Sequence, residues 1–479
     1  MSQRVPGNMA AAAPVKPFSP EEARRIVHHL QQPAVFPSMT CGWPALRWTA
    51  EHLSGCLGDR LVRFRLGRKE EKNTPLFETQ CSYVEATVAQ FLSWTRGQSG
   101  TDIGPFSKYP CSDHWAYADY KYIAMLFQDQ PFMFEDVKWS EFGFEGRDGK
   151  ESTLWIGTEG ANTPCHQDTY GCNLVLQIQG RKRWHLFPPE DTAHLYPTRI
   201  PYEESSVFSQ VDVLHPDLRR FPSFHGARAH VVILQPGQVL YVPRHWWHYV
   251  ESVDPITVSV NSWIELEADD VSRVSEAVTR AVVCAVKSSR SDDNTGDWLN
   301  PTEEGVASHG ENMQYLNLAV RACAQRRKNE LPARDPRDAC PAKRDSSGQI
   351  RKNRERIRNS APFSAPYGPD LIPVGCQEEE PGRVTLTSSE DNAVTSQQDS
   401  TVSSDTVTLM EETDLTLHKA RDCADGPSER RSEDCKELRP TTITTNDLLD
   451  CLLHPDIISR VTELLLERHT GSHGTNAPL

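Results

Sequence analysis

Between about residues 152 and 268, hydrophobic and polar positions alternate over short runs that are separated by Gly, Pro and Asp. The runs read STLWIG, CNLVLQIQG, KRWHLFPP, HVVILQPGQVLYVPRHWWHYVES and ITVSVNSWIEL. Runs this short, with several turns between them, are typical of antiparallel sandwiches and barrels rather than of strands that alternate with helices. The pattern therefore predicts a mainly β core, folded as a double sheet of the jelly-roll type.

Helical patterns flank this β-rich region. A serine cap, a proline at the first helical position and a glutamate three residues after the cap predict a helix from Ser19 to about Gln31. Apolar residues at helical spacing predict further helices at 83–95, from Asp270 to about Ser288, and at 311–325. We expect residues 15–290 to form one ordered domain.

The composition changes after residue 290. Residues 1–290 carry 29 Lys+Arg and 33 Asp+Glu, whereas residues 291–479 carry 22 and 33. A chain of this polar, charged composition buries too little apolar surface to fold, so we expect residues 1–14 and most of 291–440 to be disordered. Segment 441–470 is rich in leucine at helical spacing around Pro455 and predicts two amphipathic helices.

Two features of the whole chain narrow its class. No stretch of about 20 apolar residues is present, so no membrane span is expected. The 13 cysteines include no C-x-x-C pair, which disfavours both a zinc ribbon and a disulfide framework. We expect an intracellular protein with reduced thiols, in the cytoplasm or alternatively in the nucleus.

The stretch TPCHQDTYGCN contains a potential metal site. His166 and Asp168 are two residues apart and would share one face of a strand. His248, in VLYVPRHWWHYVES, would supply a third ligand from a neighbouring strand, with His245 as a competitor that strand alternation disfavours. Two histidines and one carboxylate form the facial triad of non-haem Fe(II) oxygenases, which leaves three coordination positions open for a 2-oxo acid and dioxygen.

A dicarboxylate cosubstrate also needs a cation and hydroxyl groups inside the barrel. Lys182 follows CNLVLQIQG, and Thr163 lies three residues before His166 on the same segment. Either side chain could point inward, although a lysine in RKRW is on its own more often a solvated strand residue. The combination with the triad favours a role for both in binding 2-oxoglutarate.

Together these motifs resemble the JmjC family of Fe(II)- and 2-oxoglutarate-dependent oxygenases, in particular its small hydroxylases. The resemblance covers about residues 15–290 and is carried by TPCHQD, GRKRWHLFPP, PGQVLYVPRHWWHYVES and TVSVNSW. It implies a cupin-like double-stranded β-helix that binds Fe(II) and 2-oxoglutarate. The iron ligands would be His166, Asp168 and His248, and the cosubstrate carboxylate would be bound by Thr163 and Lys182.

The same resemblance implies further site residues and partners. Asn173 and Asn261 would line the cosubstrate site, and Tyr117 in HWAYADY would contact the cosubstrate. An extra residue between Asp168 and Asn173 implies a loop of different shape beside the metal, which bears on substrate selectivity. The small hydroxylases imply a protein substrate. The span from KPFSPEEARRIV to SWIEL resembles a branch associated with small heat-shock proteins, which implies such a partner.

Three alternatives remain at this point. The domain could be a non-catalytic scaffold that binds a small heat-shock protein through its front part or through the leucine-rich C-terminal segment. The basic segment 321–358, with a net charge of +8, could contact nucleic acid, although a solvated linker is the commoner case. One of the small JmjC hydroxylases modifies asparagine and dimerises through helices that follow its β domain, so by analogy the helix from Asp270 could form a homodimer.

Overall fold

The fold is that of a computed structural model. It describes residues 16–69, 74–98, 100–288, 298–303, 306–330, 363–376 and 443–470. The disorder predicted for residues 1–14 and for most of 291–440 lies outside the described residues, as does most of the basic segment 321–358.

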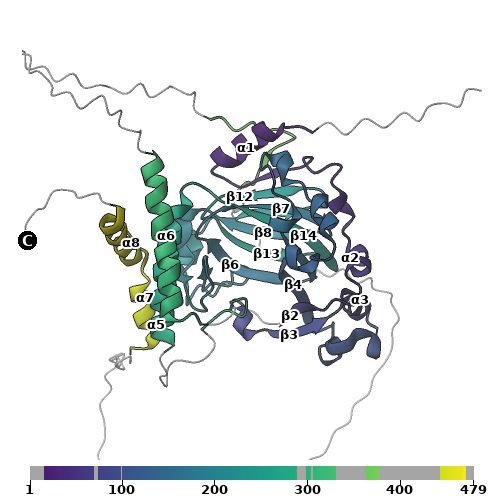
Figure 1. Ribbon diagram of the computed structural model, residues 1–479. Helices are drawn as coiled ribbons and strands as arrows, with labels where there is room; N and C mark the ends of the chain where they lie inside the picture. Colours follow the sequence, from purple (N-terminus) through teal and green to yellow (C-terminus); the bar gives the residue numbers. More distant parts are fainter. Residues whose placement is uncertain are drawn as a thin grey trace, which may run out of the picture. The chain divides into compact units, whose positions relative to one another are not determined.

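Two antiparallel sheets form the core of the domain, as the sequence predicts (Figure 1). The nine-stranded sheet has the order β15 (Ile372–Pro373), β1 (Ala34–Phe36), β12 (Val239–Val242), β7 (Cys172–Gln179), β14 (Ile256–Ile264), β5 (Thr153–Thr158), β4 (His114–Tyr122), β2 (Val62–Arg68), β3 (Ser82–Ala86). The six-stranded sheet has the order β11 (His230–Leu234), β8 (Lys182–Phe187), β13 (Trp247–Ser252), β6 (Asn162–Asp168), β10 (Ser206–Ser209), β9 (Pro197–Thr198).

Strand alternation sends the side chains of the nine-stranded sheet into two different environments. On β7 and β14, Leu174, Leu176 and Val260 belong to a large apolar core shared with the N-terminal helices. The intervening positions, such as Asn173 and Asn261, face the space between the two sheets. Because successive strand residues point to opposite faces, one strand serves both the structural core and the interior of the double sheet.

The N-terminal helices cover the nine-stranded sheet. They are α1 (Pro20–His29), α2 (Ala50–Leu57), α3 (Val88–Thr95) and the single turn α4 (Ile123–Leu126). The capping box predicted at the first helix is present, because Ser19 accepts from the Glu22 amide and Glu22 accepts from the Ser19 amide. The apolar faces of α1, α2 and α3 complete the core beneath β7 and β14.

The prediction of one helix over Tyr83–Thr95 is wrong in its first half. Residues Ser82–Ala86 form β3, which pairs with β2, and α3 begins only at Val88 after the Thr87 cap. The register places Val84 opposite Phe64, so pairing with a strand outweighs the local helical spacing. Thr87 and Gln90 form a capping box that starts the helix there.

The second group of helices follows the double sheet. It comprises α5 (Asp269–Lys287), α6 (His309–Glu330), α7 (Thr445–Leu452) and α8 (Pro455–Thr470). Figure 1 shows the four helices side by side, and their buried residues form shared clusters, for example Val278 of α5 with Leu449 of α7 and Ile458 of α8. Helix α5, for which analogy suggested a homodimer, thus packs on helices of its own chain. No helix among the described residues is long and apolar enough to cross a membrane.

A short segment within the expected linker adds to the nine-stranded sheet. Ile372 and Pro373 form β15 and pair with β1, and the Val374 amide donates to the Pro33 carbonyl. Leu371 is fully buried in the main core. The two-residue strand has no hydrophobic periodicity of its own, so this contact could not be predicted from the sequence pattern.

Candidate metal and cosubstrate site

Three potential metal ligands converge between the sheets. His166 and Asp168 lie near the end of β6, and His248 on β13 is the direct cross-strand partner of His166. One ligand atom from each residue lies within 4.8 Å of the other two, and the His166 Nε2 is 3.8 Å from the Asp168 Oδ1. The arrangement is that expected of a facial triad, since three donors lie on one side of a common centre.

Backbone carbonyls orient both imidazoles. The His166 Nδ1 is 2.9 Å from the Pro164 carbonyl oxygen, and the His248 Nδ1 is 2.9 Å from the Trp246 carbonyl oxygen. A carbonyl only accepts, so each Nδ1 carries the proton and each Nε2 keeps its lone pair for a metal. Burial lowers the pKa of both histidines to about 4, which keeps them neutral near pH 7.

His245, the competing ligand, has a different role. Its Nε2 lies 3.0 Å from the Thr169 carbonyl oxygen, and its own carbonyl accepts from the Gln167 side chain. The residue adopts a left-handed backbone conformation with φ of 67° and lies outside the ligand cluster. It therefore fixes the loop that follows Asp168.

Lys182 carries a buried amine that forms hydrogen bonds with two hydroxyl groups. Its Nζ donates to the Tyr117 hydroxyl at 3.0 Å and to the Ser259 hydroxyl at 2.8 Å. Within the described part of the chain, no carboxylate lies within 4.0 Å of this amine. Burial lowers the pKa of Lys182 to about 7. Buried charges normally have a partner, so this environment fits an anion that the protein itself does not supply.

Other polar groups around Lys182 also fit an anionic ligand. Thr163 and Tyr117 line the same cavity, as their predicted roles in binding 2-oxoglutarate require. Burial raises the pKa of the Tyr117 phenol, and the Thr163 hydroxyl opposes part of this effect. The Trp184 indole N–H is buried in the cavity wall and has no hydrogen-bond partner among the described residues. An unsatisfied buried donor is costly, and a carboxylate oxygen would satisfy it. The donor set therefore fits 2-oxoglutarate.

The inward face of β14 contacts every part of the site. Ser259 accepts from Lys182, Asn261 donates to the Asn173 side chain at 2.9 Å, and the Trp263 indole donates to the Asp168 Oδ2 at 3.2 Å. These three residues are two apart, so they share one face of the strand. The structure brings Asn173 and Asn261 together in the cavity that His166, His248 and Lys182 also line.

Several cavity residues were missing from the sequence interpretation. Trp155 donates to the side-chain Oδ1 of Asn261, and the Tyr120 ring packs at a tilt against the Trp155 ring with centroids 4.6 Å apart. The alternation in TVSVNSW could have identified Ser259 and Trp263 once Asn261 was assigned. Strand alternation could not identify Tyr120. An irregularity in the β4–β5 register and a φ of 52° turn this residue toward the cavity.

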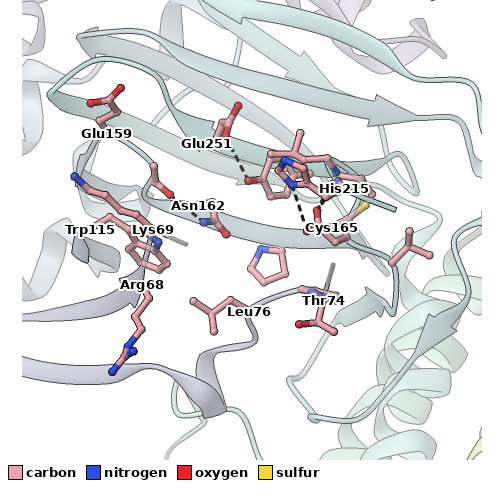
Figure 2. A pocket seen from close by; sticks show the side chains of 18 residues that line it. Arg68, Lys69, Thr74, Leu76, Trp115, Glu159, Asn162, Cys165, His215 and Glu251 are labelled. Carbon is pink, nitrogen blue, oxygen red and sulfur yellow. Dashed lines mark hydrogen bonds and ion pairs between the residues drawn. The ribbon is translucent and has the colours of Figure 1, made fainter. Parts of the chain in front are cut away.

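Two cavities adjoin β6. The metal-site cavity has a volume of about 30 Å³ and is lined by Thr163 and His166 of that strand. The other is larger, about 390 Å³, and Figure 2 shows charged side chains such as Arg68 and Glu159 in its wall together with Cys165 of β6. Among the described residues, only the smaller cavity adjoins a cluster of potential metal ligands, so it is the candidate for chemistry.

Comparison with known proteins identifies the family. A family model described as a cupin-like domain matches residues 20–270. The HSPB1-associated protein 1 homolog of Danio rerio is 56% identical over 458 residues, which cover 96% of this chain and 99% of that protein. HSPB1-associated protein 1 of Homo sapiens is 49% identical over 473 residues, which cover 95% and 94%.

A more distant similarity covers about half of the chain. Lysine-specific demethylase 8 of Xenopus tropicalis is 30% identical over 245 residues, which cover 49% of each chain. The resemblance expected from TPCHQD, GRKRWHLFPP and TVSVNSW is thereby confirmed, together with the double-sheet fold. The chain belongs to the JmjC family of cupin-like proteins, in the branch of the HSPB1-associated protein 1 relatives.

Proposed function

We propose that this protein is an Fe(II)- and 2-oxoglutarate-dependent oxygenase that hydroxylates a protein. One observation carries the proposal: a triad of His166, Asp168 and His248 lies in the same cavity system as the buried Lys182, whose amine has no carboxylate within 4.0 Å among the described residues. A structural ion pair would not leave the lysine unpaired, and a structural metal site would not need it.

The chain's own residues bind and orient the reactants. His166, Asp168 and His248 would hold Fe(II), and Lys182 with the Tyr117 and Ser259 hydroxyls would hold the far carboxylate of 2-oxoglutarate. When bound, iron with this cosubstrate and dioxygen supplies an oxidant that can hydroxylate a C–H bond. The buried cavity wall excludes water from that oxidant.

Cosubstrate binding has to widen the cavity. A volume of 30 Å³ has room for about two water molecules. A five-carbon dicarboxylate is larger, so side chains in the wall must move apart. Trp184 is a good candidate for this movement, because no hydrogen bond holds its indole N–H.

Turnover of 2-oxoglutarate tests the proposal. The full chain is incubated with Fe(II), ascorbate, 2-oxoglutarate and oxygen, with recombinant HSPB1 as one candidate protein, and succinate is measured. We expect succinate above the level of a His248→Ala variant, because loss of one of three ligands removes the metal. Equal succinate from both proteins would contradict the assignment.

A second candidate function is association with a small heat-shock protein, in the cytoplasm or nucleus. The names of the relatives suggest it, and helices α7 and α8 offer a surface for it. Their inner faces pack on α5, but an outer row remains 36–48% exposed: Leu448, Leu452, Ile457, Val461 and Leu464. Exposed apolar rows of this kind are typical of helix-binding interfaces.

Binding of purified HSPB1 to the immobilised full chain tests this function. We expect Val461→Glu to weaken binding at least 10-fold, since it puts a charge in the centre of the exposed row. The exposed charged residue Glu463 on the same helix provides the control, and Glu463→Gln should bind like the wild type. Equal affinity of Val461→Glu and the wild type would exclude this surface.

A further inference from the structure

The two oxygens of Asp168 lie in different environments. The Oδ1 is the nearer to the His166 Nε2, at 3.8 Å, and so faces the centre of the ligand cluster. The Oδ2 accepts a hydrogen bond from the Trp263 indole N–H at 3.2 Å. A carboxylate oxygen that is bound to an N–H outside the metal centre is not free to rotate toward the metal.

The Trp263 indole is held on both sides. Its backbone pairs with Asn173 across β14 and β7, which fixes the base of the side chain. Its ring is nearly parallel to that of Tyr120, with centroids 6.3 Å apart and an angle of 9° between the planes. The Tyr120 ring in turn packs against the Trp155 ring, with centroids 4.6 Å apart. Movement of the indole would therefore disturb a packed aromatic row.

We infer that Trp263 is a positioning residue that makes Asp168 coordinate the metal through one oxygen only. The inference rests on the metal site of the proposed function and adds a determinant of its coordination number. A six-coordinate ion with two histidines and a one-oxygen carboxylate has three open positions, whereas a two-oxygen carboxylate would leave two. Three are needed for a chelating 2-oxo acid and dioxygen, so the indole N–H keeps the third one open.

Metal binding without turnover tests this role. Co(II) is titrated into the full chain, its affinity is measured by calorimetry and its coordination is followed by the visible d–d absorption. The variant Trp263→Phe keeps an aromatic ring but loses the N–H. We expect its Co(II) affinity to fall about 10-fold, the lower end of the effect of losing a hydrogen-bond partner of a metal ligand. We also expect a changed d–d spectrum, because Asp168 can then bind through both oxygens.

Trp94 of α3 provides a matched control outside the site. Its ring is buried and its indole N–H also donates a hydrogen bond, but the acceptor is the Tyr109 backbone carbonyl oxygen rather than a metal ligand. Trp94→Phe should therefore bind Co(II) with the affinity and spectrum of the wild type. A purely structural role of Trp263 would lower the unfolding temperature without this selective spectral change.

Trp263→His covers the case in which the phenylalanine variant does not fold, because the imidazole retains an N–H donor. The Co(II) spectrum of Trp263→His should be closer to the wild type than that of Trp263→Phe. If Trp263→Phe is unfolded, Trp263→His should show the wild-type spectrum. Wild-type affinity and spectrum in folded Trp263→Phe would overturn the inference. If Trp263→Phe does not fold, a Trp263→His spectrum that differs from the wild type would overturn it instead. Failure of the wild type itself to bind Co(II) would instead overturn the metal site.

Discussion

Exchange of Lys182 for methionine removes the only Lys or Arg among the described residues that line the metal-site cavity, while preserving much of the side-chain volume. In the structure its Nζ contacts two hydroxyl groups, and a bound carboxylate would add a charge-assisted hydrogen bond. Such a bond contributes about 1.5–3 kcal/mol, which corresponds to a roughly 10- to 100-fold loss of 2-oxoglutarate affinity. The neighbouring Arg183 forms an ion pair with Glu251, so Arg183→Met should keep the wild-type affinity.

The pKa of Lys182 gives this prediction a pH dependence. With a pKa of about 7, the fraction of protonated lysine falls from about 0.9 at pH 6 to about 0.1 at pH 8. Binding of the dianion requires the protonated form, so the wild-type affinity should be about 10-fold weaker at pH 8 than at pH 6. His166 and His248, with pKa values of about 4, stay neutral over this range and do not obscure the effect.

Calorimetric titration of 2-oxoglutarate into the Co(II)-loaded full chain at pH 6, 7 and 8 measures both effects. Lys182→Met should bind weakly and with little dependence on pH over this range. Two results would refute the reasoning: wild-type affinity in Lys182→Met, or a wild-type affinity that is constant or increases from pH 6 to pH 8.

The remaining predictions concern the triad, the core and the C-terminal helices. His248→Ala should lose measurable Co(II) binding in calorimetry while keeping the wild-type circular dichroism, and retained binding would exclude His248 as a ligand. Asp119→Ala should lower the free energy of unfolding in urea by about 3–5 kcal/mol, because it leaves the fully buried Arg65 without its carboxylate, whereas the exposed Asp129→Ala should cost less than about 1 kcal/mol. Removal of residues 443–479 uncovers the apolar face of α5, so the unfolding temperature should fall and binding of a hydrophobic dye should rise; an unchanged unfolding temperature would contradict the packing described.

Strand periodicity made most of the fold predictable. Runs such as ITVSVNSWIEL alternate because one face packs in the core and the other faces the space between the sheets. The helix cap at Ser19 and the break at Pro455 are local signals, and both lie where the sequence places them. Tyr83–Ala86 became a strand because its partner Val62–Leu66 is distant in sequence, and a local pattern contains no information about that partner.

The metal ligands of the candidate site were predictable from the sequence, but the residues that position them were not. His166, Asp168 and His248 are residue types that commonly bind metals, and strand alternation places them on one face. The contacts of Trp263 with Asp168 and of Tyr120 with Trp155 join residues that no motif connects. The inward turn of Tyr120 depends on a backbone irregularity in β4, which the sequence around it does not reveal.

Anaerobic absorption spectroscopy of the Fe(II) protein tests the central claim most directly. Chelation of Fe(II) by the carboxylate and keto oxygens of 2-oxoglutarate gives a visible charge-transfer band. We expect this band in the wild-type protein with Fe(II) and 2-oxoglutarate and its absence in His248→Ala. A wild-type protein that binds Fe(II) and 2-oxoglutarate without any such band would contradict the account, because the two would then not meet at the triad.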